Sequence, residues 1–251
     1  MKSNLIILFS LAIFLFACED HNHNDTATGT VNLVIKAKYG AEPLVLDQKY
    51  AYFGKDTLVF TNLEFFLSNI TLKGSHTHSL STIQFIDLDS KLKTKTESEL
   101  GYILQFSDVD ATNYTAVNFS IGVPSSLNVK SPIDFKVTDP LGEPSRYWDG
   151  WKSYIFSKVE GKYSDPNSTS CKEKGFAYHS GFDTALRTID APKPMVVEAG
   201  KTTTINIEID FKSIFGNSAS SVDICKDPVF HEANAFMDAF MTRFQSAITV
   251  K

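Results

Sequence analysis

The segment KTTTINIEIDFKSIF, residues 201–215, has the most regular hydrophobic pattern of the chain. Ile205, Ile207, Ile209 and Phe211 occupy every second position, with polar residues between them. Because successive side chains of a β-strand point to opposite faces, this alternation predicts a strand with one buried face and one solvated face.

Strand patterns also dominate the chain before this segment. Runs rich in β-branched and aromatic residues are separated at short intervals by turn residues. The candidate strands lie at residues 31–39, 57–72, 81–88, 101–108, 113–124, 154–163 and 175–181, the last two as plausible neighbours. Many short strands between turns predict an antiparallel β-sandwich.

One segment near the C-terminus has a helical pattern instead: DPVFHEANAFMDAFMTRF, residues 227–244. Asp227 can cap the first amides, and Pro228 suits the first helical position. An apolar stripe at helical spacing follows, made of Val229, Ala233, Phe236, Phe240 and Phe244. The predicted fold is therefore all-β, an antiparallel β-sandwich with a C-terminal helix across one end.

The N-terminus, MKSNLIILFSLAIFLFACED, indicates export. A lysine precedes an apolar run that is too short to span a bilayer comfortably and ends in a small residue before Cys18, as in a secretory signal. The tetrad Leu15-Phe16-Ala17-Cys18 resembles a bacterial lipobox. We expect residues 1–17 to be a lipoprotein signal peptide and Cys18 to be lipidated, which would anchor the protein at the outer membrane, on its periplasmic or surface face. The alternative is cleavage near Ala17 with Cys18 left unmodified.

After Cys18, the segment to residue 29 contains no apolar side chain larger than Ala27, so we expect residues 18–29 to be a flexible tether that carries His21 and His23. The folded domain would then span residues 30–251, without a mid-chain linker or a repeat. The chain has a formal net charge of −5, and an acidic, mixed surface argues against nucleic acid as a partner.

Lipidation of Cys18 leaves two cysteines, Cys171 and Cys225. In an oxidising compartment such a pair most often forms a disulfide, and two cysteines alone offer too few ligands for a thiolate metal site. We therefore predict a Cys171–Cys225 bond.

No nucleophile elbow, P-loop, HExxH or dinucleotide fingerprint occurs, and we do not expect an enzyme. His76 and His78 form an HxH motif that we place in a loop. In an exposed loop, two solvated polar residues are a simpler interpretation than a metal site. His179 lies on a predicted strand, where a hydrogen-bonded core histidine is the usual alternative to a ligand. Both tryptophans, Trp148 and Trp151, lie in RYWDGWKSYIFSKVEG, residues 146–161; the Asp-Gly between them predicts a bend that turns one indole in and the other out.

Three segments in order carry a resemblance: LEFFLSNITL (63–72), YWDGWKSYIFSKVEG (147–161) and FAYHSG (176–181). Together they resemble the MbnP-like family of methanobactin-associated, copper-binding periplasmic or surface proteins, which are widespread as lipoproteins in Bacteroidetes. The resemblance covers roughly residues 30–250.

The resemblance implies a surface copper ion held by histidines and by an oxidised tryptophan (kynurenine) that a di-haem peroxidase-like partner makes. Trp148 matches the first tryptophan of the aromatic segment, His179 matches the Tyr-His strand, and His231 matches loosely a histidine near the C-terminal helix. The chain departs from the family in having Ser153 where a glycine is usual, and lysines where many members carry a histidine on the first strand. The sequence leaves two functions open: a copper-binding lipoprotein, or a surface β-sandwich that binds a glycan or a protein partner without metal.

Overall fold

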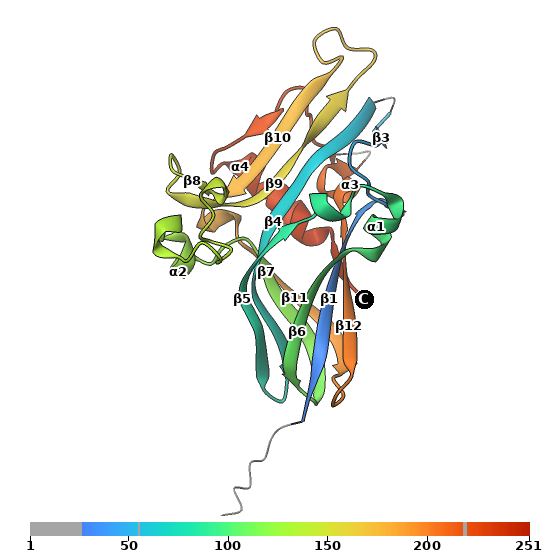
Figure 1. Cartoon of the computed structure of the whole chain (residues 1–251). Coiled ribbons are helices and arrows are strands. Elements are labelled where there is room, and N and C mark those ends of the chain that lie inside the picture. The colour runs from blue at the N-terminus through green and yellow to red at the C-terminus, as the bar shows by residue number, and fades with distance from the viewer. Residues whose placement is uncertain (1–26, 55, 218–219) are drawn as a thin grey trace, which may run out of the picture.

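The computed structural model describes residues 27–54, 56–217 and 220–251, and these residues form two main β-sheets around one core (Figure 1). The smaller sheet contains β1 (Thr28–Tyr39), β2 (Glu42–Pro43), β6 (Tyr102–Asp110), β12 (Thr202–Asp210) and β16 (Ile248–Val250). The larger sheet contains β3 (Lys49–Tyr52), β4 (Asp56–Gly74), β5 (Thr77–Asp87), β7 (Asn113–Ile121), β8 (Tyr147–Trp148), β9 (Ser153–Ser164), β10 (Lys174–Gly181), β11 (Arg187–Val196) and β15 (Val229–Phe230). The predicted fold class is confirmed.

The remaining elements are short, apart from one helix. They are the helices α1 (Lys95–Leu100), α2 (Ser125–Asn128), α3 (Phe211–Ile214) and α4 (Ala235–Ser246), the 3-10 turns η1 (Asp89–Lys91), η2 (Pro132–Asp134), η3 (Pro144–Arg146) and η4 (Asp183–Ala185), and a hairpin of β13 (Gly216–Asn217) and β14 (Ser220–Ser221). In the described part of the chain, no helix is long and apolar enough to cross a membrane.

The period-two segment forms β12, as predicted, and its isoleucines at 205, 207 and 209 are at most 1% exposed. β12 pairs in parallel with β1 from Thr30–Thr202 to Lys38–Asp210, while β6 pairs antiparallel with the other edge of β1. The smaller sheet is thus mixed, although most strand pairs of the sandwich are antiparallel.

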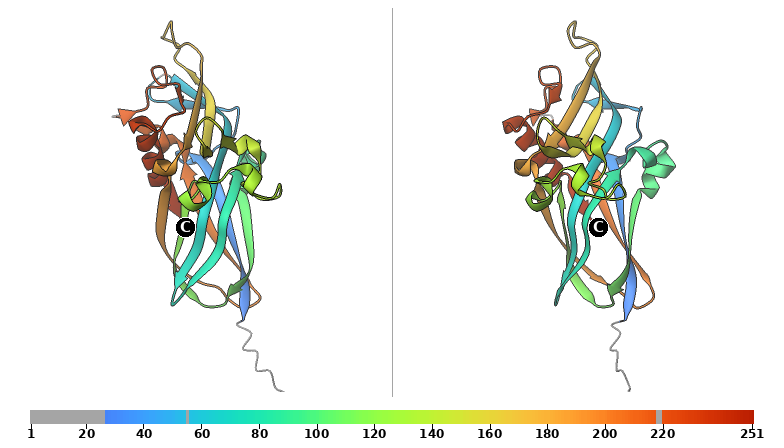
Figure 2. Two further views of the ribbon diagram at one scale, coloured as in Figure 1. Left: turned by 90° about the vertical axis from the view of Figure 1, so that its left-hand side faces the viewer. Right: turned by 60° about the vertical axis from the view of Figure 1, so that its left-hand side comes forward.

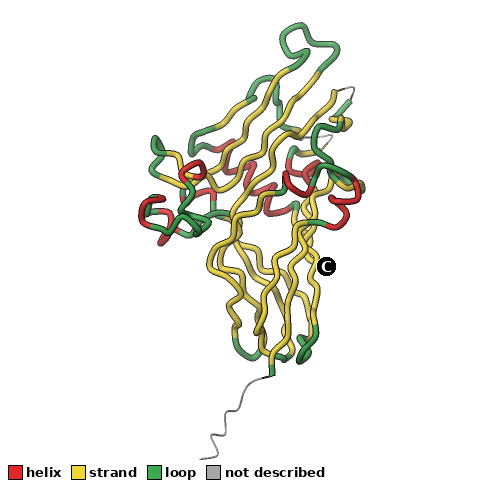
Figure 3. Tube along the Cα trace, in the orientation of Figure 1, coloured by secondary structure: helices red, strands yellow, loops and turns green. Residues whose placement is uncertain are grey.

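The 19-residue strand β4 divides the larger sheet into two regions. Its first half pairs with β3 and β9, and its second half pairs with β5 and β7. The second region faces the smaller sheet and completes the sandwich, whereas the first region, with β10 and β15, is backed by helices (Figure 1, Figure 3). The partner strand changes between Phe65, the last residue paired with β9, and Leu67, the first residue paired with β7. Register shifts with β5 and β7 follow around Asn69, whose backbone is left-handed with φ 51°.

The C-terminal helix exists, but the predicted start at Pro228 is wrong. α4 begins at Ala235, because Asn234 is its cap and accepts a hydrogen bond from the Met237 amide at 2.9 Å. Val229 and Phe230 form β15 instead, parallel to β10, with Phe230 opposite Tyr178. Residues 229–230 form a strand rather than a helix because the Phe230 ring stacks on the buried Tyr178 ring, with 4.8 Å between centroids.

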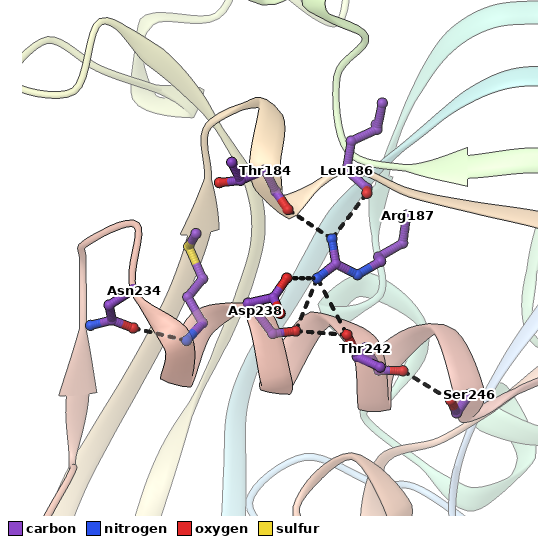
Figure 4. Close-up of polar contacts among 8 residues, drawn as sticks. Thr184, Leu186, Arg187, Asn234, Asp238, Thr242 and Ser246 are labelled. Carbon is purple, nitrogen blue, oxygen red and sulfur yellow. Dashed lines mark hydrogen bonds and ion pairs between the residues drawn. The ribbon is translucent and has the colours of Figure 1, made fainter.

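α4 lies on one side of β9 and β10, where Phe236 and Phe240 contact the Tyr178 ring (Figure 2). Arg187, at the start of β11, fixes the first turns of this helix (Figure 4). Its guanidinium donates to the Thr184 and Leu186 carbonyls at 2.8 and 3.1 Å and to the Asp238 carbonyl at 2.9 Å, and it forms an ion pair with the Asp238 carboxylate.

Cys171 and Cys225 are bonded, with Cα atoms 5.7 Å apart, so the predicted disulfide is confirmed. It joins the β9–β10 loop to the segment that leads into β15. The predicted signal peptide, Cys18, His21 and His23 lie outside the described residues, and lipidation stays a prediction.

Candidate metal centre

Both tryptophans belong to the hairpin formed by β8 and β9. Trp148 pairs with Ser153, and the turn is closed by a hydrogen bond from the Trp151 amide to the Trp148 carbonyl at 3.0 Å. The predicted bend is present, but the predicted opposition of the indoles is wrong. Because the chain reverses within the turn, the two rings stack, 4.7 Å between centroids and 13° between planes, and both are partly exposed.

The hairpin lies against the end of β10, and a glycine makes this approach possible. A Cβ atom on Gly181 would lie 2.7 Å from a ring carbon of Trp151 and 2.9 Å from the Tyr154 carbonyl oxygen. Trp151 also contacts Phe182, 5.0 Å between ring centroids. The indole pair is therefore held beside the outward-facing side chains of β10.

His179 and His231 come together because their strands are parallel neighbours. Tyr178 pairs with Phe230 and both point into the core, so the next residue of each chain segment points outward on the same face. The two imidazoles stack, 4.9 Å between centroids and 20° between planes.

Trp148 completes this group, which we call the His-Trp cluster: Trp148, His179 and His231. The Trp148 ring lies 4.7 Å from the His231 ring and 6.1 Å from the His179 ring, measured between centroids. The three residues that the sequence singled out are therefore neighbours, although they come from three distant segments.

Glu160, to which the sequence analysis gave no role, orients His179. Its Oε1 lies 2.5 Å from His179 Nε2, and the His179 side chain is 13% exposed. On β9 and β10, Lys158 is opposite His179, which places Glu160 on the same face in the diagonal position. The predicted pairing of these two strands indicates that side chains on a shared face can meet, but their register is needed to bring Glu160 to His179.

The hydrogen bond to Glu160 determines which nitrogen of His179 is available to a ligand. A carboxylate accepts, so Nε2 carries a proton, and in the neutral ring Nδ1 then keeps its lone pair. Nδ1 is buried and has no hydrogen-bond partner among the described residues, and the same holds for Nε2 of His231. Burial, followed by the neighbouring His179 ring, lowers the pKa of His231, which favours its neutral form.

Two buried imidazole nitrogens without partners are a costly arrangement, since a buried polar atom normally finds a hydrogen-bond partner. Neutral imidazole is a good ligand for copper and zinc ions. The donor set of the His-Trp cluster therefore fits a metal ion such as copper.

The other predicted pair, His76 and His78, is not confined to a loop: His76 lies in the β4–β5 turn and His78 lies on β5, and both contact Asp110.

A family model described as MbnP matches residues 28–232. The chain belongs to the MbnP family. Among solved structures it is similar to "MbnP from Methylosinus trichosporium", with a TM-score of 0.51 and 9% sequence identity over 75% of this chain and 78% of that chain. At this identity the similarity shows the fold alone. A search of curated proteins finds no match. The MbnP match includes all three residues of the His-Trp cluster.

Proposed function

We propose that this MbnP-family protein is a cell-envelope lipoprotein that binds copper at the His-Trp cluster. The observation that carries the proposal is the pair of buried imidazole nitrogens without partners, His179 Nδ1 and His231 Nε2. Membership of a copper-related family adds to it. Copper stands at the top of the divalent affinity order for such nitrogen ligands.

Glu160 has the position of a supporting residue. A carboxylate that accepts from the second nitrogen of a metal-binding histidine fixes the ring and makes the first nitrogen more basic. In this chain the Glu160–His179 contact would fix the ring and leave Nδ1 as the atom available to an ion before the ion binds.

Trp148 is the residue that we assign to the oxidised tryptophan of the family. Its ring centroid is 4.7 Å from the His231 ring, whereas that of Trp151 is 6.3 Å away. Oxidation to kynurenine would add polar atoms beside both imidazoles. Peptide mapping by mass spectrometry, on protein made with its natural neighbours, tests which of the two tryptophans is altered.

We also propose that the chain is itself no enzyme and that a di-haem peroxidase-like protein modifies Trp148. Such a partner needs a surface beside the hairpin. Val129, Ile133 and Val137 are 79%, 91% and 89% exposed. Ile133 lines a hollow with Tyr147 and Asp149 of the hairpin, so an exposed aliphatic side chain beside the hairpin supports docking next to Trp148.

Copper titration and thermal unfolding, measured together, test the site. We expect His179→Ala and His231→Ala each to lower copper affinity at least tenfold, because each removes a ligand. His76→Ala, a histidine on a different element, should leave the affinity of this site unchanged. Unchanged copper affinity in folded His179→Ala would remove His179 from the site and reduce Trp148 to an ordinary packing residue.

The second candidate is a surface module that holds a glycan or a protein partner on its aromatic side chains. It is favoured by the partial exposure of both indoles and of Tyr147. Trp151→Ala separates the two functions, because Trp151 lies farther from the histidines than Trp148 does. A copper site should lose little affinity in this variant, whereas an aromatic binding platform should lose most of its binding.

A further inference from the structure

A second group of ligand-type side chains lies at the end of the molecule where β1 begins. His76 is in the β4–β5 turn, His78 is on β5, and Asp110 is the last residue of β6, paired with Thr28 at the start of β1. Figure 1 shows this end of the sandwich at the bottom, away from β8 and β10. None of the three residues belongs to the His-Trp cluster.

The three side chains converge on a small volume. Asp110 Oδ2 lies 3.0 Å from His76 Nε2 and 3.3 Å from His78 Nδ1, and all three ligand atoms lie within 4.8 Å of one another. Around a tetrahedral zinc ion with bonds of about 2.0–2.1 Å, the ligand atoms lie about 3.3 Å apart. Two of the three separations are therefore close to this spacing, and a modest side-chain rotation would adjust the third.

The backbone holds these side chains in place. The Gly74 amide donates to the His76 carbonyl at 3.0 Å, and the Tyr114 hydroxyl donates to the Asp110 carbonyl at 3.1 Å. Gly74 also permits the two hairpins to approach, since a Cβ atom there would lie 2.7 Å from the Asn113 carbonyl oxygen. The site is thus built on two hairpin ends rather than on a single loop.

We propose that His76, His78 and Asp110 bind a divalent transition-metal ion of the zinc class. Two imidazole nitrogens and one carboxylate oxygen are a ligand set that zinc uses in proteins, with a fourth position left for water. The side chains of His76, His78 and Asp110 are 52%, 20% and 29% exposed, so an ion can reach the site from solvent. This site differs from the His-Trp cluster in its carboxylate ligand and in having no indole beside it.

The competing interpretation is that the two histidines only hydrogen-bond to Asp110 and fasten the hairpins together. Asp110→Asn separates the two, because an amide oxygen still accepts a hydrogen bond but is a weaker ligand than a carboxylate. A purely structural contact should survive this change, and a metal site should not.

The experiment is a Zn²⁺ titration by calorimetry on the full chain carrying His179→Ala and His231→Ala, which disable the proposed copper site. His21→Ala and His23→Ala are added so that the histidines outside the described residues cannot contribute. We expect one bound Zn²⁺ per chain and a higher melting temperature with Zn²⁺. Failure of the proposed copper site would not affect this result, because its ligands are absent.

His78→Ala or Asp110→Asn in that background should weaken Zn²⁺ binding at least tenfold. Thr77→Ala, a change between the two histidines that removes no ligand, is the matched control and should bind as the parent does. Absence of Zn²⁺ binding in the parent, or unchanged affinity in a folded Asp110→Asn variant, would overturn the proposal.

Discussion

Glu160 and His179 show how one hydrogen bond decides what a histidine can do. The carboxylate keeps the proton on Nε2 and leaves Nδ1 free for a ligand. Without it, the neutral ring can carry its proton on either nitrogen, and the form with a proton on Nδ1 cannot bind a metal through that atom.

Glu160→Gln is therefore expected to lower copper affinity by about ten- to a hundredfold while the protein stays folded. The amide can present either an oxygen or an N–H group to His179, so it no longer selects one tautomer. Copper titration measures the effect. Glu198→Gln, an exposed glutamate paired with Lys201, is the matched control and should have no effect. Equal affinities in wild type and Glu160→Gln would show that Glu160 does not support a ligand.

Asp89 is a half-buried acid whose ionisation opposes folding. Burial raises its pKa to about 6, although its carboxylate accepts a hydrogen bond from the Leu63 amide at 2.7 Å. The folded protein thus binds the proton more tightly than the unfolded chain, whose aspartate has a pKa near 3.8. The contribution of Asp89 to stability is then largest below the unfolded pKa and is lost as the pH rises through the folded value.

Asp89→Asn is expected to remove this decline, which we put on the order of 1 kcal/mol after allowance for solvent screening. The asparagine oxygen can still accept from Leu63, and it carries no charge at any pH. Urea unfolding at about pH 4 and about pH 7 measures the free energy of unfolding of both proteins. The loss between the two pH values should be larger in wild type than in the variant. Parallel stability profiles would contradict the assignment to Asp89.

At the scale of elements, Arg187 is the main polar link between β11 and α4. Its side chain is 12% exposed and donates to carbonyls of both the η4–β11 segment and the helix (Figure 4). A planar guanidinium serves several acceptors at once, which a lysine ammonium cannot do with the same geometry.

Arg187→Ala is expected to reduce the free energy of unfolding by about 2 kcal/mol, because several carbonyls lose a charged donor. Arg187→Lys should recover only part of this loss. Denaturant unfolding of the three proteins measures their free energies of unfolding, which we expect to decrease in the order wild type, lysine variant, alanine variant. Full recovery by lysine would mean that charge alone matters at this position.

The disulfide connects the β9–β10 loop to the segment that precedes β15 and His231. Cys171→Ser with Cys225→Ser opens a loop of sequence separation 54. In the chain-entropy model this costs about 4 kcal/mol of stability. We also expect weaker copper binding, since the strand before His231 loses its covalent attachment. Thermal unfolding and copper titration of the double variant test both effects; an unchanged melting temperature would contradict the first.

At the scale of the whole molecule, we expect the proposed lipid anchor at Cys18 to be independent of the folded domain. Cys18→Ala should release the protein from membranes without changing its melting temperature, because residues 18–29 supply almost no large apolar side chain for a core. Membrane fractionation and a thermal melt check this. A variant that still sediments with washed membranes would refute lipidation at Cys18.

The pattern of single strands was readable from the sequence, and long-range pairing was not. The alternation at Ile205, Ile207 and Ile209 gives β12 directly, since the period of two is a local property. The parallel pairing of β12 with β1 has no local signal. The same limit explains the helix: Phe236, Phe240 and Phe244 fit a helical stripe, but the stacking of Phe230 on Tyr178 can be seen only once β10 is in place.

For the candidate site, too, the sequence indicates individual residues but not their proximity. His179 and Trp148 were identified through motifs, and His231 through a loose match. Their proximity depends on the parallel pairing of β10 with β15 and on the turn after Trp148. The contact of Glu160 with His179 depends on the register that places Lys158 opposite His179, and the expected pairing of the two strands does not fix that register.

The double pairing of β1 has a mechanical consequence. β12 holds β1 along one edge from Thr30 to Lys38, and β6 holds the other edge from Thr28 to Ile35. Backbone hydrogen bonds cross between strands, so tension applied N-terminal to Thr28 and directed along β1 loads many of them together in shear. A strand at the end of a hairpin, pulled sideways, would instead unzip one bond at a time. The domain should therefore resist force applied at its N-terminal end. β1 can separate from the sheet only when its hydrogen bonds to β12 and to β6 break together.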